Sequence, residues 1–189
     1  ALVTTLDVGS GYQVTTNLNN QIKTETPPAD PGASLTRLFA NDVVAIDANK
    51  SGDDFLVVSR GGNYVMRATV APDGSLDLGA PGNVVRFQTG NIPTGVVMSQ
   101  DGTRAYTNNE VSTSVTALDL IGNQVLQLDI ASSKPPAPGT ARHRSLLGKL
   151  AFFTALGVPD VLDLDKDGNF DIDVRDIQPL AFRGKASDN

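Results

Sequence analysis

The order of short β-type segments repeats along residues 35–130 of the 189-residue sequence. Each segment is rich in Val and aromatic residues and is bounded by turn residues, which is the pattern of a short strand. Three of them, Val43–Asp47, Asp54–Ser59 and Tyr64–Val70, line up at an offset of roughly 50 residues with a second set. That set comprises Gly95–Ser99, Arg104–Asn108 and Ser114–Leu120. A repeat of about 40–50 residues with several short strands is typical of the blades of a β-propeller.

Turn residues of defined chemistry separate these strands. In Ala71–Gly74 a Pro sets φ and a Gly takes the positive-φ position, and Gln100–Thr103 carries the Asp-Gly pair of a hairpin turn. The pattern also predicts strands over Asn41–Asp47 and Asn83–Phe87. The chain has 18 Gly and 11 Pro, and this abundance of turn formers favours a β-rich fold over a helical bundle.

The predicted fold class is mainly β: a partial β-propeller of about three blades with a short C-terminal segment that holds a helix and a calcium-type loop. At about 45 residues per blade, residues 1–130 supply roughly three blades, whereas a closed ring needs at least about four. We therefore expect a fragment of a longer protein, or a chain whose remaining blades come from another chain. Ala1 is not a start Met and no basic-then-apolar leader follows it, which also indicates a processed or cut chain.

A motif within residues 83–120 narrows the type of repeat. A strand that ends in Gly is followed by Pro-x-Gly-Val, an Asp-Gly turn and a Tyr-Thr-Asn strand. The matching positions are Gly90, Pro93, Gly95, Val96, Ser99, Asp101, Gly102, Tyr106, Thr107, Asn108, Val115, Leu118 and Asp119. These residues resemble the YVTN family of β-propeller repeats. The sequence departs from the family at Gln100, where Pro is usual, and it has no Val between Tyr106 and Thr107. The resemblance implies a propeller fold but no particular activity, because propellers host many functions.

Composition and charge divide the chain near residue 131. Ser132–Gly139 is rich in Pro and is typical of a stiff linker. Ala131–Pro159 has no acidic residue and a charge of +4, whereas Asp160–Asp176 has seven Asp against two basic residues, a charge of −5. We therefore expect propeller-like blades over residues 1–130, a linker over 131–140 and a C-terminal unit over 141–189.

The C-terminal unit is predicted to begin with a helix over Thr140–Gly157. Its apolar residues have the three- and four-residue spacing of one helix face: Leu146, Leu147, Leu150 and Phe153. A Gly at the end of the helix, with a Pro two residues later, matches a helix C-terminus. We expect this helix to pack on the core.

The same helix carries a second resemblance. His143–Thr154 is similar to the Arg-x-x-x-Gly-x-x-Leu-Phe-x-Thr stretch that opens cytochrome c domains of the di-haem peroxidase-like group. In that group a Cys-x-x-Cys-His haem site follows, and this chain has no Cys. The resemblance implies that the parent protein is associated with c-type cytochrome electron transfer, with haem c only outside this chain.

Residues 163–176 carry the sharpest chemical motif. Asp163, Asp165 and Asp167 occupy positions 1, 3 and 5 of an EF-hand-like loop and Gly168 occupies position 6, so three carboxylates can converge on one cation. The predicted ligand set for Ca²⁺ is Asp163, Asp165, Asp167, Asn169, Asp171, Asp173 and Asp176. Position 12 is Val174 instead of Glu, so either of the last two members completes the site, and we expect a weak Kd of about 10⁻⁴ to 10⁻³ M. The alternative is a solvated acidic loop.

The remaining functional groups give no catalytic set. His143, the single His, is either a haem axial ligand in a larger protein or a surface residue on a basic stretch. Arg142, Arg144 and Lys149 either dock an acidic partner or form a solvated helix face. With one His and no Cys, the sequence offers no Ser-His-Asp or Cys-His arrangement, and it has no dinucleotide or phosphate-binding motif. We therefore expect no enzyme activity from this chain alone, whereas the parent resembles a peroxidase-type oxidoreductase.

Charge and hydropathy exclude two classes of partner. The net charge of −6 argues against nucleic acid, and the absence of an 18-residue apolar run argues against a membrane span. The preferred interpretation is a non-catalytic, calcium-binding portion of an exported bacterial protein, periplasmic, extracellular or on the cell surface. The alternative is a structural or adhesive surface protein whose β module binds a protein partner and whose calcium loop stiffens a linker. A third interpretation, an enzyme with its active site on the axial face of the propeller, has the least support.

Overall fold

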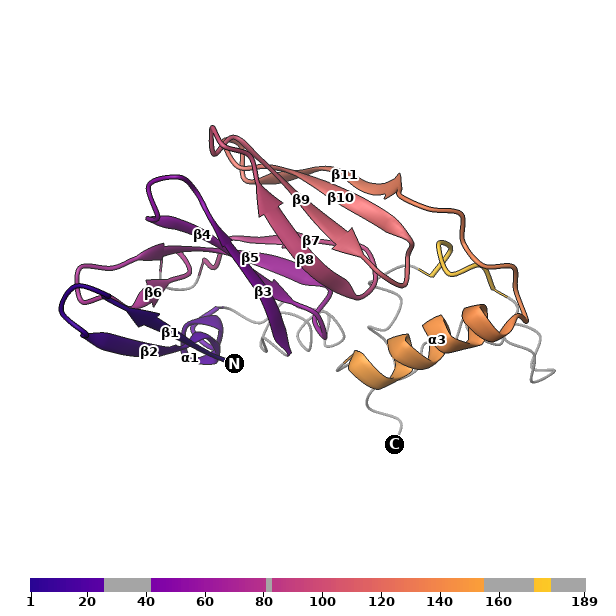
Figure 1. Ribbon diagram of the computed structural model, residues 1–189, viewed down its shortest axis with the longest axis horizontal. Helices are drawn as coiled ribbons and strands as arrows, with labels where there is room; N and C mark the ends of the chain where they lie inside the picture. The colour runs from indigo at the N-terminus through magenta and orange to yellow at the C-terminus, as the bar shows by residue number, and fades with distance from the viewer. Residues whose placement is uncertain (26–41, 81–82, 155–171, 178–189) are drawn as a thin grey trace.

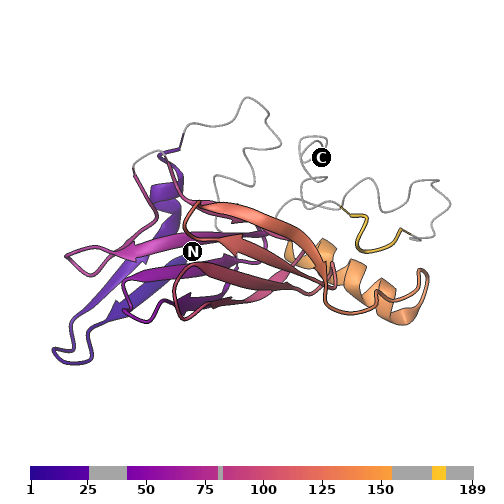
Figure 2. The same cartoon turned by 90° about the horizontal axis from the view of Figure 1, so that it is seen from above.

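The structure, a computed structural model, describes residues 1–25, 42–80, 83–154 and 172–177. Two antiparallel sheets form the centre, a two-stranded hairpin lies at one end and a helix lies at the other (Figure 1 and Figure 2). The predicted fold class, mainly β with blade-like sheets and a short C-terminal helix, is confirmed.

The elements of the described residues follow one another from the hairpin through the two sheets to the helix. In chain order they are β1 (Leu2–Leu6), β2 (Gln13–Asn17), α1 (Leu18–Ile22), β3 (Val43–Ala48), β4 (Asp54–Ser59), β5 (Tyr64–Val70), β6 (Leu76–Asp77), β7 (Arg86–Gln88), β8 (Pro93–Met98), β9 (Arg104–Asn109), β10 (Ser114–Asp119), β11 (Gln124–Ala131) and α3 (Ala141–Phe153). The first sheet has the order β3-β4-β5-β6 with β7 also paired to β5, and the second has the order β11-β10-β9-β8.

Each sheet is a meander in which strands adjacent in sequence are adjacent in space. The predicted repeat is confirmed, because β3, β4 and β5 of the first sheet correspond to β8, β9 and β10 of the second. The structure adds a fourth strand to each meander, β6 and β11, and it adds the separate β1–β2 hairpin. The described residues therefore contain two blade-like sheets and one hairpin.

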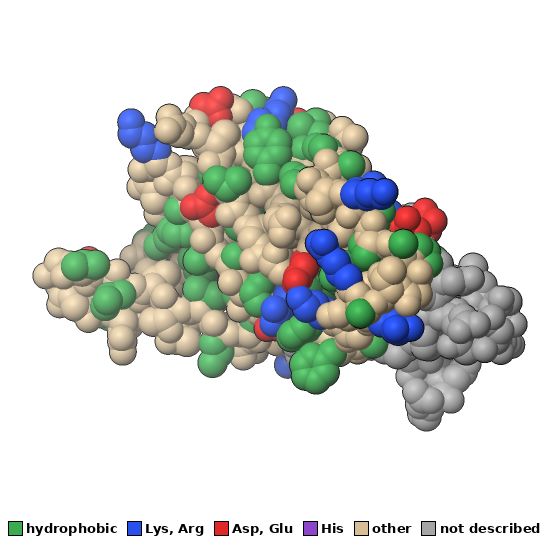
Figure 3. All heavy atoms as spheres, turned by 45° about the vertical axis from the view of Figure 1, so that its right-hand side comes forward, with side chains coloured by type: hydrophobic (Ala, Val, Ile, Leu, Met, Phe, Trp, Pro, Cys, Tyr) green, Lys and Arg blue, Asp and Glu red, His purple; other side chains and the backbone are tan. Residues whose placement is uncertain are grey.

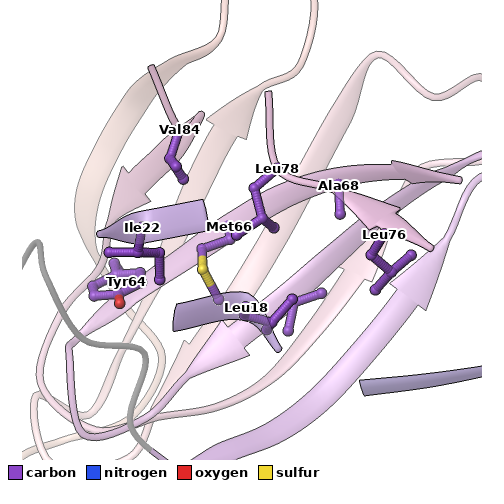
Figure 4. Close-up of a cluster of buried hydrophobic side chains, with 9 residues drawn as sticks. Leu18, Ile22, Tyr64, Met66, Ala68, Leu76, Leu78 and Val84 are labelled. Carbon is purple, nitrogen blue, oxygen red and sulfur yellow. The ribbon is translucent and has the colours of Figure 1, made fainter. Parts of the chain in front are cut away.

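The first sheet buries both of its faces. Because side chains alternate along a strand, Leu56 and Val58 of β4 point toward the second sheet, and Val57 points the other way. On that other side, Val57 lies in one apolar cluster with Leu18 and Ile22 of α1. Figure 4 shows these two α1 side chains beside Met66 of β5. The side chains on both faces are 0% exposed: Leu56, Val57, Val58, Leu18 and Ile22. Burial on both faces explains why β4 is an uninterrupted apolar run.

Polar contacts also fix the two sheets against each other. The carboxylate of Asp47 in β3 accepts a hydrogen bond from the backbone N–H of Met98 in β8 at 2.7 Å. Arg67 of β5 donates to the carboxylate of Asp54 at 2.5 Å through Nη2, and to the side-chain oxygen of Asn123 at 2.7 Å through Nη1. The hydrogen bonds to Asp54 raise the pKa of Arg67 further above its usual value, so the guanidinium stays charged between the sheets.

The C-terminal helix packs on the second sheet through the face that the sequence predicts. Helix α3 begins after Thr140, whose hydroxyl accepts a hydrogen bond from the N–H of His143 at 3.3 Å, and ends at Phe153. The last residues of the predicted range, 155–157, lie outside the described residues. Three leucines of the expected face are buried: Leu146, Leu147 and Leu150. Across the described ranges, no helix combines the length and the apolar character that crossing a membrane would require.

Candidate functional site

The predicted calcium ligands fall mostly outside the described residues. Those outside are Asp163, Asp165, Asp167, Asn169 and Asp171. Asp173 and Asp176 are described, and they lie in a turn in which the carbonyl of Asp173 accepts a hydrogen bond from the N–H of Asp176 at 2.9 Å. Within the described ranges, no three His, Asp or Glu side chains gather in a way that could hold a metal ion. The calcium site therefore stays a prediction.

The end of the acidic stretch, residues 172–177, is held against the second sheet by apolar contacts. We call it the anchor segment. Its Val174 and Ile177 are 0% and 1% exposed. They lie in one apolar cluster with Ile92, which precedes β8, with Val111 of the β9–β10 turn, and with the buried leucines of α3. The anchor segment thus joins the helix and the sheet in a single small core.

Polar contacts hold the same segment in register. The side-chain amide of Asn91 donates a hydrogen bond to the carbonyl of Ile177 at 2.6 Å. Nε of Arg175 donates to the hydroxyl of Thr113 at 3.2 Å, and Nη2 of Arg175 donates to the carbonyl of Ser133. All three contacts come from one end of the second sheet, because Asn91 precedes β8, Thr113 lies in the β9–β10 turn and Ser133 follows β11. Sequence reasoning missed them, because no local pattern marks a contact across 86 residues.

His143 is buried, so the expectation of a surface residue is wrong. Its ring is 0% exposed, because the helix turns it to the same face as Leu146 and Leu150. The N–H of Gly139 donates to Nδ1 at 3.3 Å, which leaves Nε2 to donate to the carbonyl of Ile172 at 2.7 Å. Both ring nitrogens therefore make hydrogen bonds within the chain, and a haem ligand at this position would have to give one up.

The three basic residues of α3 do not act alike. Lys149 forms an ion pair with Glu110, which follows β9. Arg142 and Arg144 are exposed and form no ion pair within the described part of the chain. Of the three basic residues that the sequence indicates, only Arg142 and Arg144 therefore have no ion-pair partner within the described residues.

The outer face of the second sheet carries one apolar row. Val97, Tyr106 and Ala117 pair in register across β8, β9 and β10 and point away from the first sheet. Val97 is 56% exposed and Tyr106 is 43% exposed. Arg104 and Asp119 pair at 2.6 Å at one end of this face. An apolar row of this kind is the feature of a sheet that packs against another layer.

The carboxylates that sit in turns are structural groups. Asp101 accepts hydrogen bonds from the hydroxyl of Ser99 at 2.6 Å and from the N–H and hydroxyl of Thr103 at 3.1 and 2.9 Å. These bonds lower the pKa of Asp101 to about 2. Burial raises the pKa of Tyr64 to about 12. A carboxylate that stays charged and a phenol that stays neutral are poorly suited to exchange protons near neutral pH.

An open cavity of about 800 Å³ lies between the β1–β2 hairpin and the first sheet. Apolar residues such as Val3, Phe55 and Leu76 line it, and Asp7 and Asp73 are its acidic lining residues. Each of these carboxylates accepts hydrogen bonds from its own turn, which lowers its pKa. The cavity therefore offers an apolar surface with negative charges. Both carboxylates are already hydrogen-bonded within their own turns.

Comparisons with known proteins give structural likeness only. No family model matches the sequence, and no curated protein matches it significantly. Among solved structures, the chain resembles Kuenenia stuttgartiensis hydrazine synthase, with 18% identity, a TM-score of 0.40, and coverage of 59% of this chain and 27% of that one. It also resembles a functionally unknown protein from Desulfotomaculum acetoxidans DSM 771 (18% identity, TM-score 0.49, 75% of this chain and 38% of that one). A third is a protein from Lactobacillus plantarum (18% identity, TM-score 0.42, 69% of this chain and 36% of that one). The chain thus spans less than two fifths of each of these proteins.

Proposed function

We propose that this chain is a non-catalytic binding and structural module that supplies propeller blades of the YVTN type to a larger β-propeller. The observation that carries this proposal is the outer face of the second sheet, with Val97 and Tyr106 more than two fifths exposed. The first sheet demonstrates how this fold covers such a row, because its own β4 is packed on both sides. The partner for the outer face is a further four-stranded sheet of the same or another chain.

The energetic argument is the burial of apolar surface. Completely burying a Val or a large apolar side chain contributes about 1.5–3 kcal/mol. A row of three in-register residues, of which Val97 and Tyr106 lose most of their exposure, would therefore hold a neighbouring sheet. The interface between the two described sheets uses the same kind of residue, with Met98, Ala105 and Leu118 in its cluster.

The test uses the absence of cysteine from the chain. Val97→Cys places a thiol on the outer face, and Val8→Cys places one in the β1–β2 turn, where Val8 is 90% exposed. In the isolated chain both thiols should react quickly with a maleimide. In the native full-length protein, only the thiol at position 97 should become protected. Equal reactivity of the two thiols in the native protein would refute the proposed blade contact.

Calcium binding by residues 163–176 is part of the proposal. The acidic set includes Asp173, which lies in the anchor segment, so a cation held there would also tie the preceding acidic stretch to the second sheet. We expect calcium to protect residues 160–180 from proteolysis and a chelator to remove that protection. Asp163→Asn combined with Asp165→Asn should abolish the calcium effect, whereas Asp7→Asn should leave it unchanged. If neither calcium nor a chelator changes the rate of proteolysis in this region, the proposed calcium site is excluded.

Export and association with c-type cytochrome electron transfer complete the proposal. They are supported by the similarity of His143–Thr154 to the opening of di-haem peroxidase-like cytochrome domains and by the lack of Cys. The test is the intact mass of the native polypeptide together with its visible spectrum. A heavier, red protein with a Soret band, recovered from the periplasm or the cell surface, is the expected result. A colourless protein would instead favour a structural or adhesive surface role.

A further inference from the structure

The outward face of α3 is fixed by the residues that the helix buries. His143, Leu146, Leu147 and Leu150 are at most 7% exposed and point into the core. At 3.6 residues per turn, a residue two positions beyond Leu150 lies on the opposite side of the helix. Phe152 occupies that position and is 81% exposed. A large aromatic ring therefore stands on the solvent face of the helix, one residue before its C-terminal end.

The ring of Phe152 contacts the ring of the next residue, Phe153. The two rings pack edge-on, with ring centroids 5.0 Å apart and an interplanar angle of 88°. The guanidinium of Arg60 lies 3.9 Å from the centroid of the Phe153 ring, and Arg60 is itself paired with Asp42 at 2.6 Å. An aromatic ring that already has a packing contact loses less conformational entropy on binding than one without, which suits it to anchor a partner.

Positive charge lies toward the N-terminal end of the same helix, where Arg144 and Arg142 precede Phe152 by about 12 and 15 Å along the helix axis. Arg142 and Arg144 are exposed, and α3 contains no Asp or Glu. Gly148 lies between Arg144 and Phe152 on the same face, and a Cβ added there would meet no atom within 4 Å. Figure 3 shows Lys and Arg side chains gathered beside hydrophobic ones on the side of the molecule that carries the helix. The patch is basic on a chain whose net charge is −6.

We propose that the outward face of α3, formed by Arg142, Arg144, Gly148 and Phe152, docks an acidic protein segment that places an apolar side chain against Phe152. Charge complementarity selects the occupant, because two arginines favour carboxylates. Aromatic residues and Arg are the side chains most enriched at the centres of protein interfaces. This surface is separate from the outer face of the second sheet, so the inference does not depend on the blade contact.

The experiment selects random dodecamer peptides displayed on phage against the whole immobilised chain and measures the synthetic peptides by fluorescence anisotropy. The selected peptides should be acidic and contain a large apolar residue. Phe152→Ala should weaken their binding about tenfold or more, as expected for an interface anchor worth more than 1.4 kcal/mol. Arg142→Glu with Arg144→Glu should abolish binding, and added salt should weaken the binding of the unaltered chain.

Matched controls separate the patch from general effects. Val8→Ala removes an apolar side chain that is 90% exposed but lies in the hairpin turn, and Lys134→Ala removes an exposed cation outside the helix. Both should leave peptide affinity unchanged. Circular dichroism should confirm that the Phe152→Ala chain is folded, because the ring is mostly in solvent.

Three outcomes would overturn the proposal. The first is a selection that yields no peptides, or only neutral or basic ones. The second is acidic peptides whose affinity is indifferent to Phe152→Ala. The third is a concentration-dependent dimer, or binding to phosphatidylserine vesicles, that Phe152→Ala abolishes while the acidic peptides fail to compete, which would assign the face to a second copy or to a lipid surface.

Discussion

The side-chain amide of Asn91 donates a hydrogen bond to the carbonyl of Ile177 across 2.6 Å, and both residues are almost completely buried. The amide oxygen of Asn91 lies 3.4 Å from Nδ2 of Asn63, whose own oxygen accepts from the N–H of Ile92 at 2.8 Å. A chain of amides therefore connects the β4–β5 turn, the start of the second sheet and the anchor segment. Loss of one member should weaken all three regions together.

Asn91→Ala should destabilise the protein by about 1–3 kcal/mol, because it leaves the buried carbonyl of Ile177 without its donor. Urea unfolding followed by circular dichroism measures the change. Asn108→Ala is the matched control, since Asn108 is exposed and bonds only to the hydroxyl of Thr94 at 3.0 Å among the side-chain contacts. Equal losses for the two variants would contradict the role given to the buried amide chain.

His143→Leu should release the anchor segment from the helix. Leu fills much of the ring's volume but cannot donate to the carbonyl of Ile172, and an unsatisfied buried acceptor costs about 1–3 kcal/mol. Hydrogen exchange at residues 172–177, measured by mass spectrometry, should become faster. His143→Gln should restore part of the protection, because its amide can donate to the same carbonyl. If the Leu and Gln variants exchange alike, the hydrogen bond has no anchoring role.

Asp101→Asn should make the free energy of unfolding less dependent on pH in the acidic range. The folded-state pKa of Asp101 is about 2, below its ordinary value of 3.8, because Ser99 and Thr103 donate to the carboxylate. A lowered pKa contributes stability above about pH 4 that is lost as pH falls toward 2. The urea midpoint of the unaltered chain should therefore fall more than that of the variant over this window. Other titrating groups are common to both chains and cancel in the difference. Parallel pH profiles would show that the turn does not hold the carboxylate.

Gly148→Ala should stabilise the chain by up to about 1 kcal/mol, because Ala favours an α-helix over Gly by roughly that amount. The added Cβ meets no atom within 4 Å. Gly79→Ala is the opposite case, since Gly79 has a φ of +126° and its Cβ would lie 2.6 Å from the carbonyl oxygen of Asn83. The melting temperature should therefore be higher for Gly148→Ala and lower for Gly79→Ala than for the unaltered chain. A fall for both would show that α3 is not an ordinary solvent-exposed helix at position 148.

The strands that the sequence predicts best are those whose burial is simplest. The predicted ranges of β4 and β5 coincide with the structure, because both strands are rich in β-branched and aromatic residues and are bounded by turn residues. Strand β11 was not predicted, since Gln124, Gln127 and Asp129 interrupt its pattern and its pairing with β10 shifts register. The β1–β2 hairpin was also missed, because its Thr-rich strands pair only with each other.

The candidate site was less accessible from sequence than the fold. Burial of His143 had a signal, because it precedes Leu146, Leu147 and Leu150 by three, four and seven residues, the spacing of one helix face. A single imidazole is also a candidate metal ligand, and that chemistry pointed away from the buried position that the spacing indicates. The contacts of Asn91 and Arg175 had no signal, because long-range hydrogen bonds follow from the packing of whole elements.

The anchor segment also determines how the molecule would respond to tension. Tension applied at residue 177 must first displace the buried Ile177 and Val174. It must also break the hydrogen bonds of Asn91 and Arg175 before it loads β11. Strand β11 is an edge strand, so only its inner side is paired within the sheet. Tension applied at residue 177 is therefore borne by the anchor segment before it reaches the sheet.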